Sequence, residues 1–366
     1  MSSAVFETSF GFIKERIEAI DPIAYGRTRN FINGAVTYLS PFISRGVVST
    51  KEILQVVLDK GYQPKQIEKF IQELAWRDYW QQIWIAKGNA VDNDLKHPQP
   101  DVQFHEIPTA IVQGKTGIEA IDSAIAEFYR TGYLHNHVRM YIAAICTNMA
   151  KCHWHQPAQW MYYHLLDADW ASNALSWQWV AGANSNKKYV ANQDNINKYC
   201  HSKQQGTFLD VSYEALSVMG VPQELTTITP VNLQTKLPES ESIDVDPTLP
   251  SLIYNFYNLD PHWRTEEHVN RILLLEPSHF KKYPVSNKSL QFTLNLSKNI
   301  EGIQVFVGEF QDLVNTHNLQ SVFFKEHPTS IHYKGEQEER DWMFSVSGYF
   351  PSFFSFWKKC KKELKW

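Results

Sequence analysis

Cysteine and long hydrophobic runs are both scarce in this sequence. The four cysteines, Cys146, Cys152, Cys200 and Cys360, have no C-x-x-C spacing between them. Zinc and iron–sulfur sites commonly use that spacing, so we expect no metal site of this kind. No apolar run approaches the length of about 20 residues that a membrane-spanning helix needs, and the N-terminus lacks a signal-type pattern. The sequence therefore predicts a protein of the reducing cytoplasm that contacts no membrane.

An excess of positive charge is also missing, since the formal net charge is −4. The surface as a whole is therefore not built to attract nucleic acid, although a local basic groove stays open as an alternative. Aromatic residues are plentiful instead and make up 14% of the chain, with 12 Trp, 17 Tyr and 21 Phe. This content favours stacking on a flat ligand or a base, with filling of a large helical core as the alternative.

Histidine is common enough to raise a metal hypothesis, because the chain contains 14 of them. The closest pairs are His135 with His137 and His153 with His155. Residues two positions apart do not share a helix face, so we interpret both pairs as surface or cofactor-adjacent residues.

The hydrophobic pattern changes along the chain and predicts three segments. Up to about residue 220 the apolar spacing is helical: Ser49 is a plausible N-cap before an apolar run, and Ile118, Ile121 and Ile125 share one face. Residues 221–250 contain five prolines among Thr, Ser, Glu and Asp and predict a linker.

Strands and helices alternate after the linker. The predicted order is a strand at 271–275, a helix at 287–299, a strand at 303–307, a helix near 310–317 and a strand at 321–324. Such alternation implies a parallel sheet. The sequence thus predicts a mainly α-helical domain over residues 1–220, a Pro-rich linker over 221–250, and a small α/β domain with a parallel sheet over 251–366.

Four segments of the helical part carry polar residues too specific for packing alone. Arg139 illustrates the point, because it lies in an apolar helix where an unpaired charge would cost several kcal/mol. It needs an anionic partner, and Asp167 and Asp169 lie in a similarly apolar setting. The segments are YGRTRN (25–30) with TYLSP (37–41), ELAWRD (73–78), TGYLHNHVRM (131–140) and LDADWASNALSWQW (166–179).

Together these segments resemble the FAD-binding domain of the DNA photolyase/cryptochrome family. Residues 131–140 and 166–179 look like its TGWxHNRxRM and LIDxDxASNxxxWQW patterns, and the first two segments look like its GTSxLSPYL and ExxWRE blocks. The likeness runs from about residue 20 to 200 with the blocks in the same order. It implies a mainly α-helical FAD-binding domain of this type.

The resemblance also implies which residues hold FAD. Tyr25, Thr37, Leu39 and Ser40 would cradle the diphosphate, with Arg77 also at the cofactor. Arg139 would pair with Asp167 beneath the isoalloxazine ring, and Asp169 would accept a hydrogen bond from the ring edge or the ribose. Asn136 and Asn173 would complete the site, with Asn173 facing N5 of the flavin.

Electron transfer and substrate binding follow from the same resemblance. Trp177 and Trp154 match the two inner members of the family's tryptophan chain, while Phe104 stands where the outermost tryptophan is expected. A tyrosine such as Tyr133, Tyr162 or Tyr163 would then be the exit residue, and packing of Trp154 as core filler is the alternative. The residues expected to contact a flipped-out cyclobutane dimer are Glu73, Trp76, Asn136, Met140 and Trp179.

Three functions stay open at this point. The first is light-driven repair of cyclobutane pyrimidine dimers in DNA by a monomeric photolyase, a carbon–carbon lyase. The second is blue-light sensing by a cryptochrome-like flavoprotein without repair, which His137 in place of a DNA-contacting Arg favours. The third is flavin binding with no role for light. Asn136 and Met140 stand where six-four photolyases have histidines, so six-four repair is disfavoured.

Overall fold

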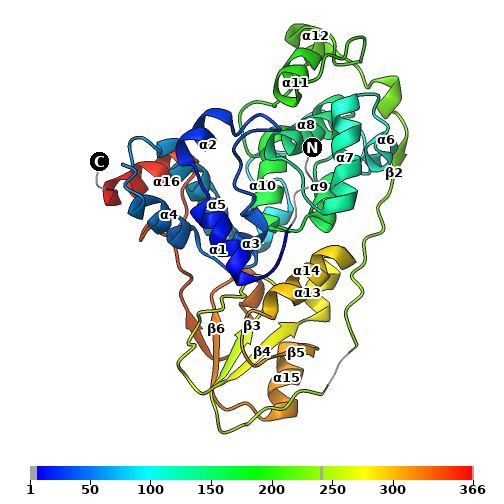
Figure 1. Cartoon of the computed structure of the whole chain (residues 1–366). Coiled ribbons are helices and arrows are strands. Elements are labelled where there is room, and N and C mark those ends of the chain that lie inside the picture. The colour runs from blue at the N-terminus through cyan, green and yellow to red at the C-terminus, as the bar shows by residue number, and fades with distance from the viewer. Residues whose placement is uncertain (1–5, 240–241, 365–366) are drawn as a thin grey trace. The chain divides into compact units, whose positions relative to one another are not determined.

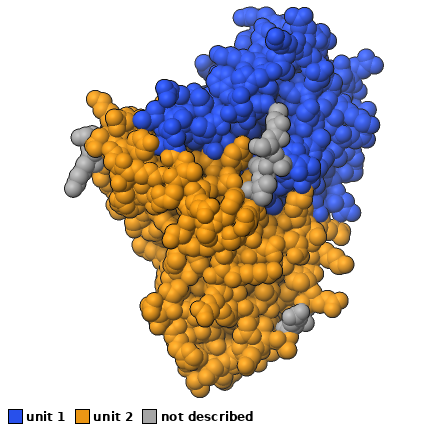
Figure 2. Space-filling view, viewed as in Figure 1, with its two compact units in different colours: residues 1–5, 21–36, 87–233 blue, residues 6–20, 37–86, 234–366 orange. Residues whose placement is uncertain are grey.

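A computed structural model of the chain describes residues 6–239 and 242–364. They divide into two compact units, each assembled from segments that are distant in sequence (Figure 2). The described part of the first unit comprises residues 21–36 and 87–233. The second unit comprises residues 6–20, 37–86 and the rest of the described chain from 234 onward. The two units therefore interleave in sequence, whereas the predicted segments 1–220, 221–250 and 251–366 are continuous.

The first unit is almost entirely helical (Figure 1). A two-residue antiparallel ladder joins β1 to β2, with Ile107 opposite Thr229. Its elements are α2 (Pro22–Thr28), η1 (Gly88–Asp92), β1 (Ile107–Pro108), α6 (Thr109–Gln113), α7 (Glu119–Thr131), α8 (Asn136–Ala144), the π-helix η2 (Ile145–Met149), α9 (His155–His164), α10 (Trp170–Ala181), α11 (Gln193–Cys200), α12 (Tyr213–Val218), η3 (Gln223–Leu225) and β2 (Ile228–Thr229).

The second unit combines four N-terminal helices with a five-stranded parallel sheet (Figure 1). Its helices are α1 (Phe10–Glu18), α3 (Ser40–Ser44), α4 (Thr50–Asp59), α5 (Glu68–Lys87, whose last residue falls in the first unit), α13 (Pro277–Lys282), α14 (Asn287–Ser297), α15 (Phe310–His317), η4 (Pro328–Ser330), α16 (Phe353–Cys360) and η5 (Lys361–Glu363). Its strands are β3 (Ser251–Tyr254), β4 (Asn270–Leu275), β5 (Ile303–Val307), β6 (Val322–Lys325) and β7 (Glu336–Glu338).

The strand order in this sheet is β5-β4-β3-β6-β7. The chain builds outward from β3 to β5 and then returns to place β6 on the other side of β3, as doubly wound sheets do. One face buries Ile253, Ile272 and Leu274 against Phe310 and Leu313 of α15. Alternate strand residues point to the opposite face, and they are buried too, as a parallel sheet requires.

The predicted fold class is confirmed, and most predicted elements lie where the pattern placed them. Ser49 caps α4 by accepting a hydrogen bond from the Glu52 N–H at 3.0 Å. The helices predicted at 287–299 and 310–317 and the strands at 271–275, 303–307 and 321–324 appear within two residues of their expected ends.

Several features of the fold were not predicted. Strand β3, the centre of the sheet, follows the linker directly and was missed because four apolar-rich residues after Pro250 give too short a pattern. Strand β7 consists of Glu-Gln-Glu and has no strand-like pattern at all. Residues 221–250 are irregular as predicted, except for η3 and β2. None of the described helices is long and apolar enough to cross a lipid bilayer.

Candidate functional site

The centre of the candidate site in the first unit is an ion pair between two helix-anchored residues. Arg139 on α8 places Nη1 3.0 Å from Oδ2 of Asp167, and its Nε donates to the Leu134 carbonyl at 2.8 Å. The side chains keep 21% and 5% of their surface exposed. Arg139 therefore has the anionic partner that its apolar helix demanded, while the role of both residues as cofactor ligands stays a prediction.

A glycine allows the Asp167 loop to reach this position. Gly132 ends α7 with φ +74°, a left-handed conformation that side chains with a Cβ rarely adopt. A Cβ added there would lie 2.8 Å from Leu166 Cγ. Leu166 itself donates its N–H to the Gly132 carbonyl at 2.8 Å. The Thr-Gly step of segment 131–140 thus sets the distance between α7 and the loop that carries Asp167.

Asn173 is fixed by the helix next to its own. Its Nδ2 donates to the Ala158 carbonyl of α9 at 2.8 Å, and the residue is 7% exposed. This bond leaves Oδ1 as an acceptor, which suits a ligand N–H. Asp169 starts the same helix, because its Oδ1 accepts from the Ser172 N–H at 3.0 Å.

Histidines near α8 are neutral at physiological pH. Burial lowers the pKa of His135 to about 4, and burial likewise lowers the pKa of His137 to about 4. His135 caps α8 through Nδ1, which accepts from the His137 N–H, and His137 stacks on Tyr199 at 4.6 Å between ring centroids. His137 therefore adds no positive charge where the resemblance expects an arginine.

The predicted tryptophans of the first unit differ sharply in exposure. Trp154 and Trp177 are 0% and 2% exposed, whereas Trp179 is 40% exposed on a mostly buried helix. Asn136 is exposed and Met140 is half-buried on α8, and Tyr25 is half-buried on α2. The first unit thus offers buried indoles and one open indole, which are the properties expected for electron transfer and for stacking.

The segment after α5 contributes residues that the sequence did not reveal. Asp94 accepts from Trp154 Nε1 at 2.7 Å, and Asp92 accepts from Trp170 Nε1 at 2.7 Å. Gln178 of α10 holds this segment in place by donating to the Val91 carbonyl and accepting from the Leu95 N–H. Trp170 lies inside a recognised segment and was passed over, while Asp92 and Asp94 lie in a segment without any motif.

The remaining predicted site residues lie in the second unit. Leu39 and Ser40 open α3, and the Thr37 Oγ1 accepts from the Leu39 N–H at 3.4 Å. Leu39 is buried, whereas Thr37 and Ser40 are half-buried.

Glu73, Trp76 and Arg77 share one face of α5 by their spacing of three and four residues. Trp76 stacks on Phe353 of α16, with ring centroids 3.8 Å apart and planes 10° apart. One face of this indole is therefore covered by α16, a contact that the sequence did not predict.

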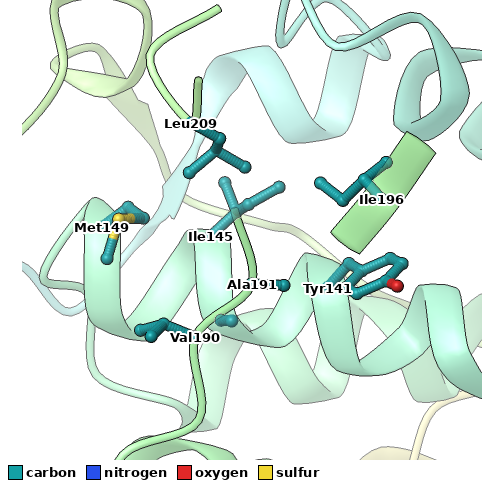
Figure 3. Close-up of a pocket in the computed structure, with 8 residues that line it drawn as sticks. Tyr141, Ile145, Met149, Val190, Ala191, Ile196 and Leu209 are labelled. Atoms are coloured by element: carbon teal, nitrogen blue, oxygen red, sulfur yellow. The ribbon is translucent and has the colours of Figure 1, made fainter. Parts of the chain in front are cut away.

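A small apolar hollow in the first unit is separate from these residues (Figure 3). Its lining includes Tyr141, Ile145, Met149, Ile196 and Leu209. The Tyr141 hydroxyl already donates to Asn195 Oδ1 at 2.7 Å. The hollow carries no charged side chain and none of the predicted cofactor residues, so it does not suit a flavin diphosphate.

The residues around Arg139 do fit a flavin. A cationic guanidinium on a nearly buried carboxylate gives a polar floor, and the Asn173 amide of the same unit is a fixed acceptor. Among the described residues, no group of three or more His, Cys, Asp or Glu side chains is placed to hold a metal ion.

Comparisons with known proteins point to the same part of the chain. Residues 70–213 match the family model described as the FAD binding domain of DNA photolyase. A deoxyribodipyrimidine photo-lyase of Streptomyces griseus is 31% identical over 156 residues, which are 42% of this chain and 34% of that protein. A cryptochrome DASH of Gloeobacter violaceus is 29% identical over 175 residues, 45% of this chain and 35% of that protein.

A solved structure of a Synechocystis cryptochrome superimposes with a TM-score of 0.48 at 22% identity, over 54% of this chain and 44% of that one. The chain spans about a third of the length of the curated relatives it matches.

Proposed function

Since residues 70–213 belong to the photolyase/cryptochrome family, we propose that the protein is a photolyase that repairs cyclobutane pyrimidine dimers in DNA under blue or near-ultraviolet light. FAD is the cofactor of this domain. The bound flavin supplies light absorption and one-electron transfer, and the protein supplies position and electrostatics. Arg139 and Asp167 hold the flavin, and the Asn173 Oδ1 accepts a hydrogen bond from it.

The observation that carries the repair proposal is the exposure of Trp179. A helix whose other indoles, Trp170 and Trp177, are buried presents this one with 40% of its surface open. Its ring is held by Tyr189, whose centroid lies 6.1 Å away. An open, fixed indole is a stacking platform for a base, and such stacking is worth about 1–3 kcal/mol per base. Extruding a damaged pair to reach it is comparatively cheap, because the lesion is already poorly stacked.

The resemblance also assigns dimer contacts to α5 of the second unit. The residues concerned are Trp76, for stacking on the lesion, and Glu73, for a hydrogen bond with the pyrimidine edge. Asn136 and Met140 contact the dimer from α8.

The test is illumination of the reduced, flavin-loaded protein with an oligonucleotide that contains one thymine dimer. The expected result is recovery of thymine absorbance in the light and none in the dark. Trp179→Ala should weaken binding of the dimer oligonucleotide about 5- to 150-fold. Tyr213→Ala removes another aromatic side chain of the first unit, 44% exposed, and should leave binding unchanged. A photoreducible protein that restores no thymine would contradict the proposal.

Light sensing without repair is the second candidate function. Two observations favour it: His137 is neutral, and the net charge of the chain is −4. Each weakens the electrostatic attraction to DNA phosphates. Titration of the dimer oligonucleotide at increasing salt separates the candidates. Affinity that falls steeply with salt supports repair, whereas absent or salt-independent binding beside intact photoreduction supports sensing.

A further inference from the structure

Two indole–carboxylate pairs lie side by side in the first unit. Trp154 Nε1 donates to Asp94 Oδ1, and Trp170 Nε1 donates to Asp92 Oδ1, each at 2.7 Å. The two indole rings have centroids 6.4 Å apart and planes at 36°. Both are buried, at 0% and 2% exposed. Such short bonds from buried indoles to carboxylates provide each indole with a base at hydrogen-bond distance.

Asp94 is surrounded by hydrogen-bond donors. Its Oδ1 also lies 3.2 Å from His153 Nε2, and its Oδ2 accepts from the Gln99 N–H at 2.7 Å. Burial lowers the pKa of His153, so this ring is neutral at physiological pH and donates to Asp94 without a positive charge. The Asp94 side chain keeps 23% of its surface exposed, so the carboxylate links the buried Trp154 to water.

The electron path proposed for this chain lacks an outer indole beyond Trp154. Phe104 stands where the resemblance expects that indole, and it adjoins the residue before Trp154, because the His153 N–H donates to the Phe104 carbonyl at 2.7 Å. An oxidised indole cannot oxidise a phenyl ring. Tyr162, one of the expected exit residues, is only 1% exposed and meets Trp170 edge-on at 5.4 Å. Phe104 and Tyr162 therefore offer no route for an electron vacancy from Trp154 to the surface, which leaves retention at Trp154 itself as a way to prolong it.

We propose that Asp94 is the proton acceptor that traps oxidised Trp154. This inference rests on the proposed function, in which Trp177 would give one electron to the bound flavin under light. Trp154 then gives one electron to oxidised Trp177 and becomes an indole radical cation, which is strongly acidic at Nε1, unlike the neutral indole. The Nε1–H bond breaks, the proton joins Asp94 Oδ1, and a neutral indolyl radical and a neutral carboxyl group remain. An external thiol later returns one electron and the proton moves back.

Proton transfer to Asp94 makes the return of the electron slow, because the indolyl radical must regain a proton to be reduced. The distance suits this role, since a positioned base acts at about 2.6–3.2 Å from the proton-bearing atom. Asp92 offers the same chemistry to Trp170 and therefore provides a matched control.

The first measurement uses the protein without flavin and concerns the hydrogen bond itself. In protein labelled with ¹⁵N-tryptophan, Asp94→Asn should shift the indole N–H resonance of Trp154, which Trp154→Phe identifies by its disappearance. Asp92→Asn should shift the Trp170 resonance instead. An unmoved Trp154 resonance in Asp94→Asn overturns the inference, because the bond on which it depends would be absent.

The second measurement is transient absorption of the flavin-loaded protein after a light pulse. In Asp94→Asn the deprotonated tryptophan radical should form about a hundredfold more slowly, the lower end of what a positioned base contributes. The yield of lasting photoreduction should fall with it. In wild type the deprotonated radical should form more slowly in D₂O than in H₂O, and this difference should disappear in Asp94→Asn. Asp92→Asn should behave like wild type. Wild-type kinetics in Asp94→Asn, or the loss appearing in Asp92→Asn instead, overturns the inference.

Trp177→Phe and Trp154→Phe separate this inference from the proposed function. If both leave photoreduction unchanged, the proposed electron path itself fails. If both abolish photoreduction while Asp94→Asn leaves it intact, the path stands and the role of Asp94 is refuted.

Discussion

Arg139 and Asp167 depend on each other, because neither charge is stable alone at their depth in the first unit. The pair is held by a 3.0 Å hydrogen bond, and Asp167 keeps only 5% of its side chain exposed. A buried pair of this kind adds little stability compared with an apolar pair of the same size, but removing one partner leaves an uncompensated charge. The pair is therefore better understood as a support for a ligand than as a stabilising contact.

Arg139→Ala should release flavin and lower the free energy of unfolding by about 3 kcal/mol, since the buried Asp167 carboxylate loses the guanidinium that compensates its charge. Flavin absorbance of the purified protein and urea unfolding measure the two effects. Arg130→Ala is the control, because that side chain pairs with Glu127 on the surface. Its loss should lower the free energy of unfolding by less than about 1 kcal/mol. A fully flavin-loaded Arg139→Ala would contradict the assignment.

The residue scale also shows where sequence reasoning ends. Arg139 could be paired with an acid in advance, because a charge inside an apolar helix demands one. The hydrogen bond of Asp94 could not be predicted, because nothing in its local sequence indicates a contact with Trp154, 60 residues away. A surface-type segment and a buried indole become partners only through the fold.

Among the elements, α7 and the loop before α10 are linked by one glycine. Gly132 combines a positive φ with a close approach to Leu166, and Leu166 directly precedes Asp167. Gly117, which precedes α7, shares the positive φ, at +78°, but a Cβ there meets nothing within 4 Å. Alanine substitution at Gly117 therefore tests backbone strain alone, whereas substitution at Gly132 tests strain together with displacement of the loop.

Gly132→Ala should weaken flavin binding, because the added methyl group pushes the Asp167 loop away from Arg139. Both Gly132→Ala and Gly117→Ala should lose about 1–3 kcal/mol of stability to backbone strain. Flavin affinity, measured by fluorescence titration, should fall only in Gly132→Ala. Equal affinity in the two variants would show that the loop accommodates the methyl group.

Helix α16 is the second element with a consequence for function. It begins with a capping box at Ser352 and Ser355 and buries Phe353, which stacks on Trp76. The neighbouring Phe354 is 70% exposed on the same helix. The C-terminal helix thus orients an indole that the proposed function assigns to the substrate.

Phe353→Ala should lower the free energy of unfolding by about 3 kcal/mol, the usual cost of removing a buried phenyl ring. It should also weaken binding of a dimer oligonucleotide, because Trp76 loses the ring that holds it, while flavin loading stays unchanged. Phe354→Ala should alter neither quantity. Unchanged oligonucleotide affinity in Phe353→Ala would remove Trp76 from the substrate site.

At the scale of the whole molecule, periodicity predicted the elements but not their grouping. Apolar runs such as Leu273-Leu274-Leu275 identify β4 without any tertiary information. The assignment of residues 37–86 to the same unit as the sheet depends on contacts such as Arg45 Nη1 to the Phe256 carbonyl, which are 211 residues apart. No local pattern encodes a contact of that range, so the predicted boundary at residue 220 describes composition rather than compact units.

The second unit carries a pH dependence that follows from this grouping. His279 packs against Phe256, Tyr257 and Phe280 around the carboxyl end of β3. Burial lowers the pKa of His279 to about 3, with the nearby Arg45 adding to the effect. Burial also lowers the pKa of His327, which stacks on Tyr257 with 4.2 Å between centroids.

The sign follows from the protons bound in each state. Below pH 6.5 the unfolded chain takes up a proton on His279, while the folded unit excludes it until about pH 3. Stability is therefore present above pH 6.5 and is lost as the pH falls, by about 1.4 kcal/mol per pH unit for this one group. Asp78 acts in the opposite sense, because burial raises its pKa to about 6, so its protonation opposes part of the acid loss.

His279→Phe isolates the histidine contribution, since Asp78 and His327 are common to both proteins. The phenyl ring keeps the apolar contacts of the imidazole. The substitution removes His279 Nε2, a buried atom without a hydrogen-bond partner among the described residues. Urea unfolding between pH 6 and 4 should give a slope against pH that is shallower than wild type by about 1.4 kcal/mol per unit. His268→Gln, at an exposed histidine, should keep the wild-type slope. An equal slope in His279→Phe and wild type would mean that His279 is protonated in the folded unit, and that the core around β3 admits water.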